Sequence, residues 1–535
     1  MSVVLRRYLP VLVLLLALAL RLWGIGWGLP DSNHAFSYHP DESMVVGSAL
    51  LQPGQNLLDT NFYNYGSLVS LTDRFLMLAT GLGNTPVPST AALLLARCVT
   101  VAYGVGTCAL LVALGRRLEK PGVGLSAAAL YAVAPLAVQH GHFATVDVAA
   151  TFWVTASLFA ALTPQPPLPT SARSSLPLWE RGSLFWCGLL AGLAAATKYN
   201  AGLVLLAGII AILLNPLRSE ERAKAGEGRR LSGGERQLKP LALLLGAALL
   251  GFLLGCPGAL VNFPTFFGQL TDELKHSRNP DEYFVGQLAA LYWPTLGLLA
   301  ALGSPLWLVG VGRALVSRTK TELVLLAFVL PYLLLICVSA NQYIRYALPI
   351  LPALCWLIAS LPWKPLTALT GAVSLAFSVA LCSVMALTDP RDEALAFLRQ
   401  RGVASVGFAR GPWYWSPPLA PGTTHPIPPA AKRAAASSEF VKLFVVPDGN
   451  DWKTDLLDTN PDAVVLSEIE YATAVQKQTP EVLAYLAALT ARYPHKTVFS
   501  HPLPLLGARE SNGLPCQPLP IDMIYPNQSV VVFTK

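Results

Sequence analysis

Two adjacent carboxylates, Asp41 and Glu42, follow a proline directly after the first long apolar segment of the chain. Taken alone, they are best explained as first-turn residues of a helix, where capping and the helix dipole favour acidic side chains. A catalytic role as a general base would require other polar groups at the same place. Such groups would have to come from other elements of the chain.

The composition indicates that most of the chain lies in a membrane. Of its 535 residues, 53% are hydrophobic and only 13% are charged, and the mean hydropathy is +0.49. A soluble domain carries about 25% charged residues. The net charge of +7 does not indicate a nucleic-acid-binding protein, because no basic stripe with interleaved aromatic residues is present. The eight cysteines form no CxxC pair, which argues against a thiolate metal site.

Apolar runs long enough to span a bilayer recur down to about residue 388. The first run follows Arg6 and Arg7 and is too long for a signal peptide, so we expect an uncleaved anchor. About eleven transmembrane helices are predicted, at 9–29, 89–115, 122–140, 144–162, 183–198, 200–215, 240–261, 288–312, 321–340, 343–361 and 365–388.

The distribution of Lys and Arg orients these spans. With a cytoplasmic N-terminus, every cytoplasmic connection is basic and the opposite loops are poor in Lys and Arg, as the positive-inside rule requires. The runs 183–198 and 200–215 are kept separate, because merging them would move the basic loop that follows to the outside. Two cytoplasmic loops, 163–182 and 217–239, have compositions typical of disorder. The first outer loop covers about 30–88.

The composition changes after residue 388, and residues 389–535 are predicted to form a small α/β domain outside the cytoplasm. Residues 1–388 form the transmembrane domain. The expected helices of the second domain are 392–401 and 482–489, and its expected strands are 403–408, 463–466, 497–500 and 530–533.

This topology collects polar groups on one membrane face. Each has an ordinary explanation: the cations as interfacial anchors, the histidines as loop residues, and Asp147 as a helix cap. Together, carboxylates beside cations suit a reaction in which a hydroxyl group is the acceptor and a phosphate is the leaving group. The outer-face groups are His39, Asp41, Glu42, Tyr65, Arg97, His140, His142, Asp147, Lys198, Tyr199, Asp272, Glu273, His276, Arg278 and Arg345.

The ordered set of short motifs resembles the membrane-embedded GT-C glycosyltransferases, specifically the protein O-mannosyltransferase and lipid A aminoarabinose transferase group (family 39-like). The resemblance covers about residues 1–390. The segments that carry it are His39-Pro40-Asp41-Glu42, Ala96-Arg97, His142-Phe143-Ala144-Thr145-Val146-Asp147, Lys198-Tyr199-Asn200 and Arg345-Tyr346-Ala347-Leu348-Pro349.

The resemblance implies a sugar donor carried on a polyprenyl phosphate and transfer with inversion, with Asp41 as general base. Glu42 and Asp147 would orient hydroxyl groups of the acceptor or the sugar. The residues expected to bind substrate or phosphate are Arg97, Lys198, Tyr199, Arg345, His39, His142 and Tyr65. No metal is required, because these cations can neutralise the phosphate; His142 with Glu42 is the pair that a divalent ion would use.

The expected function is therefore transfer of a sugar to a protein, lipid or cell-envelope glycan acceptor at the outer face of the cytoplasmic membrane. The partners are membrane lipids, the lipid-linked donor and the acceptor, and not nucleic acid. A transporter or lipid flippase would place ionisable residues in the middle of spans and often shows internal repeats, and neither is evident. A non-catalytic membrane scaffold that presents the C-terminal domain would leave the outer polar cluster unexplained.

Overall fold

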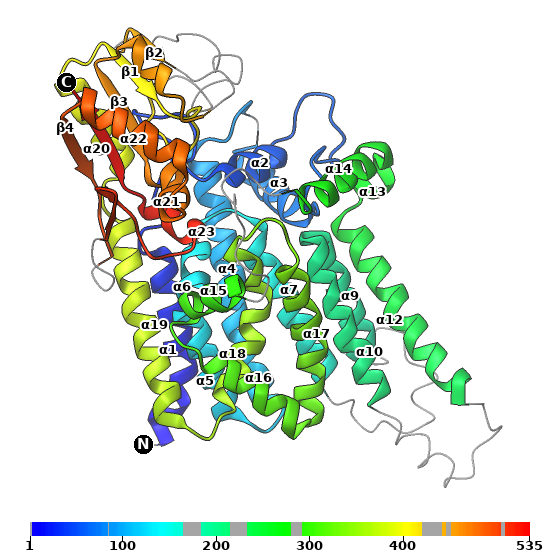
Figure 1. The fold of residues 1–535 in the computed structure, drawn as a ribbon. Helices are drawn as coiled ribbons and strands as arrows, with labels where there is room; N and C mark the ends of the chain where they lie inside the picture. Colours follow the sequence, from blue (N-terminus) through cyan, green and yellow to red (C-terminus); the bar gives the residue numbers. More distant parts are fainter. Residues whose placement is uncertain are drawn as a thin grey trace, which may run out of the picture.

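The computed structural model describes residues 3–83, 85–163, 183–214, 233–279, 292–419, 441–445, 451–503 and 509–535. A helical bundle forms the larger part, and a smaller part made of a sheet and helices lies over one end of it (Figure 1). The short helices within residues 30–88 lie at that same end of the bundle.

The bundle follows the predicted apolar runs. Its helices are α1 (Val3–Leu22), α4 (Thr90–Arg117), α5 (Pro121–Val133), α6 (Pro135–Gln139), α7 (Val146–Leu162), α9 (Ser183–Thr197), α10 (Leu205–Leu213), α12 (Gly233–Gly255), α15 (Tyr292–Leu302), α16 (Leu306–Ser317), α17 (Lys320–Cys337), α18 (Leu351–Ala359) and α19 (Lys364–Met385). Short 3-10 helices are η1 (His140–His142), η2 (Tyr199–Val204) and η4 (Ile344–Ile350). The helices at the end of the bundle are α2 (Pro40–Ala49), α3 (Leu68–Thr80), α13 (Gly258–Val261) and α14 (Phe263–His276).

Two predicted spans are broken helices. The run 122–140 consists of α5 and a second segment bent by 63° from it, because Pro135 lacks the N–H that would continue the helix. The run 288–312 is divided between α15 and α16, where Gly303 adopts a positive φ of 62°. Hydropathy alone does not detect either break.

The predicted boundaries differ at several places: α1 ends at Leu22 and not near residue 29, and α12 ends at Gly255 and not near residue 261. Residues 233–239, expected to be disordered, form the first turns of α12, in agreement with the high helix propensity of Glu235, Arg236, Gln237 and Leu238. The rest of that loop, and the loop 163–182 apart from Thr163, lie outside the described residues.

Four of the described helical segments are long and apolar enough to cross a membrane: Thr90–Arg117, Leu238–Gly255, Lys320–Cys337 and Lys364–Gln400. The bent segment that begins with α5 makes a fifth if it is one span. Several other predicted spans correspond to apolar helices of 10–17 residues. The total of about eleven transmembrane helices therefore stays a prediction.

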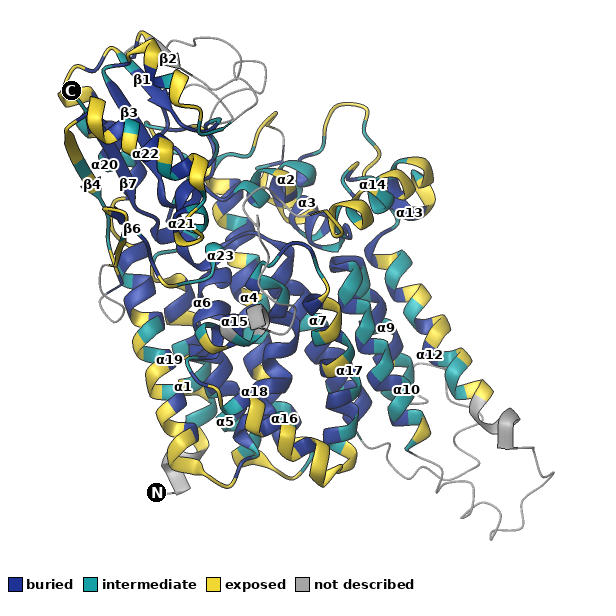
Figure 2. Cartoon of the chain, viewed as in Figure 1, coloured by how far each residue is buried: buried dark blue, intermediate teal, exposed yellow. Residues whose placement is uncertain are grey.

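The outward faces of the bundle are apolar. Large side chains such as Leu15 on α1, Leu249 and Leu254 on α12 and Leu369 on α19 are more than half exposed, and Figure 2 shows the exposed faces of these outer helices around a buried interior. A soluble monomer rarely exposes large contiguous apolar patches. Together with the spans, this identifies a multi-pass membrane protein.

The smaller part contains a five-stranded sheet in the order β2-β1-β3-β7-β4. Strands β1, β2 and β3 are parallel, and β7 runs antiparallel to both β3 and β4. Apolar runs make β3 and β7 almost fully buried, as expected for central strands. Its elements are α20 (Pro390–Gln400), β1 (Ser405–Phe408), β2 (Leu443–Val445), η6 (Thr454–Thr459), β3 (Ala463–Ser467), α21 (Glu468–Gln476), α22 (Pro480–Arg492), β4 (His495–Phe499), the hairpin β5 (Glu510–Ser511) and β6 (Leu514–Pro515), α23 (Ile521–Ile524), η7 (Tyr525–Asn527) and β7 (Val530–Thr534).

Each helix and strand predicted for residues 389–535 has a counterpart, in α20, α22, β1, β3, β4 and β7. The sequence did not indicate β2, α21, the small hairpin or α23. An aromatic cluster joins this part to the bundle, with Trp27, Tyr38 and Phe143 packed beside Tyr414 and Leu503. The contact places the C-terminal residues next to the His39–Glu42 stretch.

Candidate functional site

The helix α2 directs its two carboxylates to different places. It begins at Pro40, a residue suited to the first helical position because its missing N–H would have no partner there. Asp41 and Glu42 occupy the first turn, although the N-cap His39 makes no side-chain capping bond. Successive helical residues point about 100° apart. Asp41 therefore faces a cavity, whereas Glu42 is completely buried.

Glu42 anchors α2 to the bundle. Its carboxylate accepts hydrogen bonds from Arg97 Nε at 2.8 Å and Nη2 at 2.7 Å, and from the backbone N–H of Ala144 at 2.7 Å. The Ser37 hydroxyl donates to the same group. Burial alone would raise the pKa of Glu42, but the charge and hydrogen bonds of Arg97 outweigh it and hold the pKa below its ordinary value. These bonds leave Glu42 no free direction toward a substrate.

Arg97 is equally enclosed. Besides Glu42, its guanidinium donates to the carbonyl oxygens of Ile25 at 2.6 Å and Trp27 at 2.7 Å, and the side chain is fully buried. It therefore joins α4 to α2 and to the segment that follows α1. We assign Glu42 and Arg97 to positioning, although the sequence predicted substrate contacts for both.

Asp41 forms a looser pair with the arginine predicted to bind phosphate. Arg345 Nη2 lies 3.3 Å from Asp41 Oδ2, and the two side chains are 14% and 21% exposed. The guanidinium also lies over the Tyr343 ring, 4.3 Å from its centroid. The backbone N–H of Arg345 donates to Asp522 Oδ2 at 2.8 Å. The C-terminal part thus fixes the backbone of a residue in the site.

A second ion pair joins Lys198 and Asp147. Lys198 Nζ lies 2.6 Å from Asp147 Oδ1, and both side chains are largely buried. The ammonium also lies 4.6 Å from the ring centroid of Tyr346 and 5.9 Å from that of Tyr65. Cation–π contacts of this kind hold a cation in place.

Tyrosines from the segment between α2 and α3 and from the bundle complete this side of the site. The nearby Asp41 charge, with burial, raises the pKa of Tyr65 well above its ordinary value, so the phenol keeps its proton and can donate it in a hydrogen bond. The Tyr199 hydroxyl donates to the carbonyl oxygens of Tyr63 at 2.6 Å and Tyr65 at 3.0 Å. Tyr199 thus positions the Tyr65 loop.

The three histidines have different surroundings. His142 lies with Nδ1 2.8 Å from the carbonyl oxygen of Val138 and Nε2 2.9 Å from that of Trp23, so both nitrogens face backbone groups and neither faces Glu42. His39 and His140 line the cavity. Burial lowers the pKa of His39, although Asp41 and Glu42 oppose the shift. Both ring nitrogens of His140 are buried without a hydrogen-bond partner among the described residues.

A cavity of about 110 Å³ lies between the bundle and the C-terminal part. From the bundle side it is lined by residues that include Asp41, His140 and Arg345. The opposite wall comes from the C-terminal part and contains aromatic side chains and one carboxylate. The residues of this wall are Trp413, Trp415, Ile469, Ile521, Asp522 and Tyr525.

Residues 90–225, about a quarter of the chain, match the family model described as dolichyl-phosphate-mannose-protein mannosyltransferase. This segment contains Arg97, Asp147 and Lys198, three of the residues on which the resemblance rested. The chain is a glycosyltransferase. No curated protein matches its sequence significantly.

Solved structures with distant similarity to this glycosyltransferase include ArnT from Cupriavidus metallidurans bound to undecaprenyl phosphate, at 16% identity and a TM-score of 0.48, covering 73% of this chain and 70% of that chain. A second is AglB, the oligosaccharyltransferase of Archaeoglobus fulgidus, in complex with an inhibitory peptide and a dolichol-phosphate, at 12% identity and a TM-score of 0.47, covering 92% and 73%. A third is the Pmt1-Pmt2 protein O-mannosyltransferase complex of S. cerevisiae bound to the sugar donor, at 18% identity and a TM-score of 0.33, covering 50% and 35%.

The structure brings six of the predicted site residues of the glycosyltransferase into three ion pairs, Asp41 with Arg345, Asp147 with Lys198 and Glu42 with Arg97. A scaffold protein would not require this convergence. Sequence analysis missed the wall contributed by the C-terminal part. Only the structure identifies Asp522 as a residue of the site. Burial raises the pKa of its carboxyl group despite the opposing charge of Arg345.

Proposed function

We propose that this glycosyltransferase moves a sugar from a polyprenyl phosphate to a hydroxyl acceptor at the outer face of the cytoplasmic membrane. The mannosyltransferase family model, whose description includes a dolichyl-phosphate sugar, supports a lipid-phosphate donor. The bias of Lys and Arg toward the opposite loops supports the orientation, with the N-terminus inside and the C-terminal domain outside.

Asp41 is the general base in this proposal. The observation that carries the choice is its exposure: its side chain is 21% exposed and lines the cavity, whereas those of Glu42 and Asp147 are 0% and 3% exposed. The acceptor oxygen attacks the anomeric carbon and passes its proton to Asp41. The bond from that carbon to the phosphate oxygen breaks, and polyprenyl phosphate leaves with the bonding electron pair. Attack opposite the leaving group inverts the configuration.

Arg345 and Lys198 bind the phosphate. Positioned cations in a poorly hydrated site stabilise the charge that develops on a leaving group. In the structure, each of these cations is paired with a carboxylate. Donor binding therefore replaces the carboxylate with the phosphate as the partner of the cation. When Arg345 turns toward the phosphate, Asp41 is released to accept a proton. Donor binding thereby prepares the base, and these two cations suffice without a catalytic metal.

The aromatic wall of the C-terminal part binds the acceptor or the transferred sugar. Trp413 and Tyr525 present ring surfaces to the cavity, and Asp522 adds a hydrogen-bond acceptor. Aromatic faces combined with a few polar groups suit a molecule that has both apolar faces and hydroxyl groups. Tyr65, which keeps its proton and lies near the Asp41 charge, donates a hydrogen bond beside that carboxylate.

The test is release of polyprenyl phosphate by the purified full-length protein in nanodiscs. Polyprenyl-phosphate sugars are supplied with membrane extract as the source of acceptor. The polyprenyl phosphate that is released is quantified by mass spectrometry. Wild type is compared with Arg345→Ala, for which we expect a loss of at least about a hundredfold in turnover. The matched control is Arg313→Ala, whose side chain is 43% exposed and contacts Glu322 and the carbonyl of Ser360, away from the cavity.

The expected pattern is turnover in wild type and Arg313→Ala and near-complete loss in Arg345→Ala. Failure of every lipid-phosphate sugar to react with wild type would overturn the donor class. Equal turnover in Arg345→Ala and Arg313→Ala would remove Arg345 from the phosphate site.

A further inference from the structure

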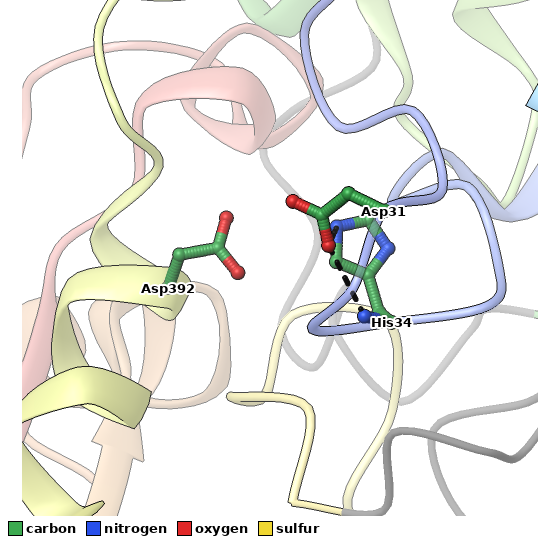
Figure 3. A group of neighbouring side chains, drawn as sticks. All are labelled: Asp31, His34 and Asp392. Carbon is green, nitrogen blue, oxygen red and sulfur yellow. Dashed lines mark hydrogen bonds and ion pairs between the residues drawn. The ribbon is translucent and has the colours of Figure 1, made fainter.

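A second group of metal-binding side-chain types lies outside the cavity. Asp31 and His34 belong to the loop after α1, and Asp392 belongs to the first turn of α20. One ligand atom from each of the three lies within 4.8 Å of the others. Figure 3 shows the Asp392 carboxylate on its own element, pointing across a gap toward Asp31 and His34. None of the three lines the cavity.

His34 has the geometry of a ligand whose second nitrogen is fixed. Its side chain is 1% exposed, and Nδ1 lies 2.5 Å from the carbonyl oxygen of Phe36. A carbonyl oxygen can only accept, so Nδ1 carries the proton and the neutral ring has its lone pair on Nε2. Metal-binding histidines usually donate their other N–H to a carbonyl or carboxylate in this way.

The remaining nitrogen of His34 is aimed at the carboxylates but is not hydrogen-bonded. Nε2 lies 3.7 Å from Asp31 Oδ1, and no described residue forms a hydrogen bond with it. The lone pair of this nitrogen is therefore free to bind a cation. Because it faces the Asp31 carboxylate, it points to a cation between the three side chains.

The carboxylates leave oxygens directed at the same gap. Asp31 Oδ1 accepts the backbone N–H groups of Asn33 and His34, and Asp392 Oδ1 accepts the Tyr38 hydroxyl at 2.7 Å. Within the described ranges, no hydrogen bond reaches either Oδ2, and no Lys or Arg forms an ion pair with Asp31 or Asp392.

Arg391, the neighbour of Asp392 in the chain, is already paired with another carboxylate. Arg391 stacks on Tyr38, with its guanidinium carbon 3.8 Å from the ring centroid. It pairs through two nitrogens with Asp389 at 2.7 Å. Arg391 acts on Asp392 only through space, and neither Asp31 nor Asp392 has a Lys or Arg ion-pair partner of its own among the described residues.

We propose that Asp31, His34 Nε2 and Asp392 bind one divalent zinc-type cation, which joins the loop after α1 to α20. One imidazole and two carboxylates suit Zn²⁺, with water in the remaining position. Metal–ligand bonds of about 2.0–2.2 Å require the side chains to close by roughly 1 Å. The exposed side of Asp31, whose side chain is 49% exposed, provides the entry path. The ion holds the C-terminal part against the segment that leads into His39–Glu42.

The experiment uses the full-length protein in detergent, stripped with a chelator and then titrated with Zn²⁺. Bound metal is measured by elemental analysis, and the melting temperature Tm by differential scanning fluorimetry. We expect one zinc per chain and a rise in Tm on the order of a few degrees. Ca²⁺, which takes six to eight oxygen ligands, should give neither effect.

Three variants distinguish zinc binding at this site from zinc binding elsewhere on the protein surface. Asp31→Asn and His34→Gln should lower the apparent zinc affinity by at least about tenfold and abolish the rise in Tm. Asp458→Asn removes a carboxylate that is 65% exposed and pairs with Arg492 in the same C-terminal part, and it should bind zinc like wild type. Because Asp31 is exposed, its variant folds even if His34→Gln does not.

Unchanged zinc uptake in Asp31→Asn, or no zinc uptake by wild type, would overturn the proposal. The outcome is independent of the glycosyl-transfer mechanism. The proposed site lies outside the cavity, so the chelated protein should keep its turnover at low temperature while its Tm falls. Loss of turnover at unchanged Tm would instead indicate a catalytic metal.

Discussion

Asp41 and Glu42 are neighbours in the chain, and each faces an arginine, yet the two pairs have different physical characters. Glu42 and Arg97 are fully buried and joined by two short hydrogen bonds, with further bonds to the backbone. Asp41 and Arg345 make one contact of 3.3 Å beside a cavity and remain partly exposed. An ion pair whose hydrogen-bonding positions are all occupied stabilises the fold, whereas a loose ion pair can exchange partners. One step along a helix therefore separates a positioning residue from a candidate base.

The largest expected effect on stability comes from breaking the enclosed pair. Glu42→Gln leaves the Arg97 guanidinium buried with its charge unpaired, which should lower the free energy of unfolding by about 3–5 kcal/mol. We expect a marked fall in Tm and in folded yield, measured by fluorescence-detected size exclusion. Glu119→Gln, which removes an exposed carboxylate, should leave both unchanged. A Glu42→Gln protein as stable as wild type would show that the pair does not anchor α2.

The second pair in the site should matter for catalysis. Lys198→Ala removes a cation from the proposed phosphate position and should lower kcat by about 10²–10³-fold. It also leaves Asp147 without its 2.6 Å partner, so Tm should fall as well. Lys198→Arg keeps the charge and should recover part of the rate. The comparison is a steady-state assay of all three proteins, and a normal kcat for Lys198→Ala would exclude this role.

The enclosed pair should also control stability at low pH. The pKa of Glu42 is held below its ordinary value of 4.5 by Arg97. Its contribution is therefore fully present above about pH 4.5 and is lost as the pH falls through the lower pKa of the folded state. Tm measured from pH 7 down to pH 3 should be flat at first and then decline. In Glu42→Gln this part of the decline should be missing, and identical pH profiles would contradict the assignment.

The smallest expected effect concerns the wall opposite Asp41. Trp413→Ala removes one ring surface from the cavity, and an aromatic contact contributes about 0.5–1.5 kcal/mol. The KM for the acceptor should rise by roughly 2–10-fold, with the KM for the donor unchanged. Trp413→Phe should lie close to wild type. If the donor KM rises instead, the wall binds the donor.

The sequence predicts the elements better than the contacts. Hydropathy located the apolar runs, and the Val-rich segments of β3 and β7 predicted strands, because both signals are local. The kink at Pro135 and the break at Gly303 also had local signals, but a hydropathy window averages over them. The helix α21 was missed because Glu468–Gln476 has no clear amphipathic period.

The division of roles in the site could not be predicted in the same way. Motif order placed Arg97, Lys198 and Arg345 on one face, but whether each cation is enclosed or open depends on partners 50 or more residues away, such as Glu42 for Arg97. Trp413 and Asp522 belong to a part of the chain without a recognisable motif. They enter the site only because an aromatic cluster docks that part on the bundle.

The central claim is that the open pair performs the chemistry, and Asp41→Asn tests it most directly. The measurement is single-turnover sugar transfer by wild type and Asp41→Asn, each preloaded with lipid-phosphate donor, with Tm recorded on the same samples. We predict a rate lower by about a hundredfold or more with donor still bound and Tm essentially unchanged. Transfer by Asp41→Asn at the wild-type rate would contradict the assignment of Asp41 as the base.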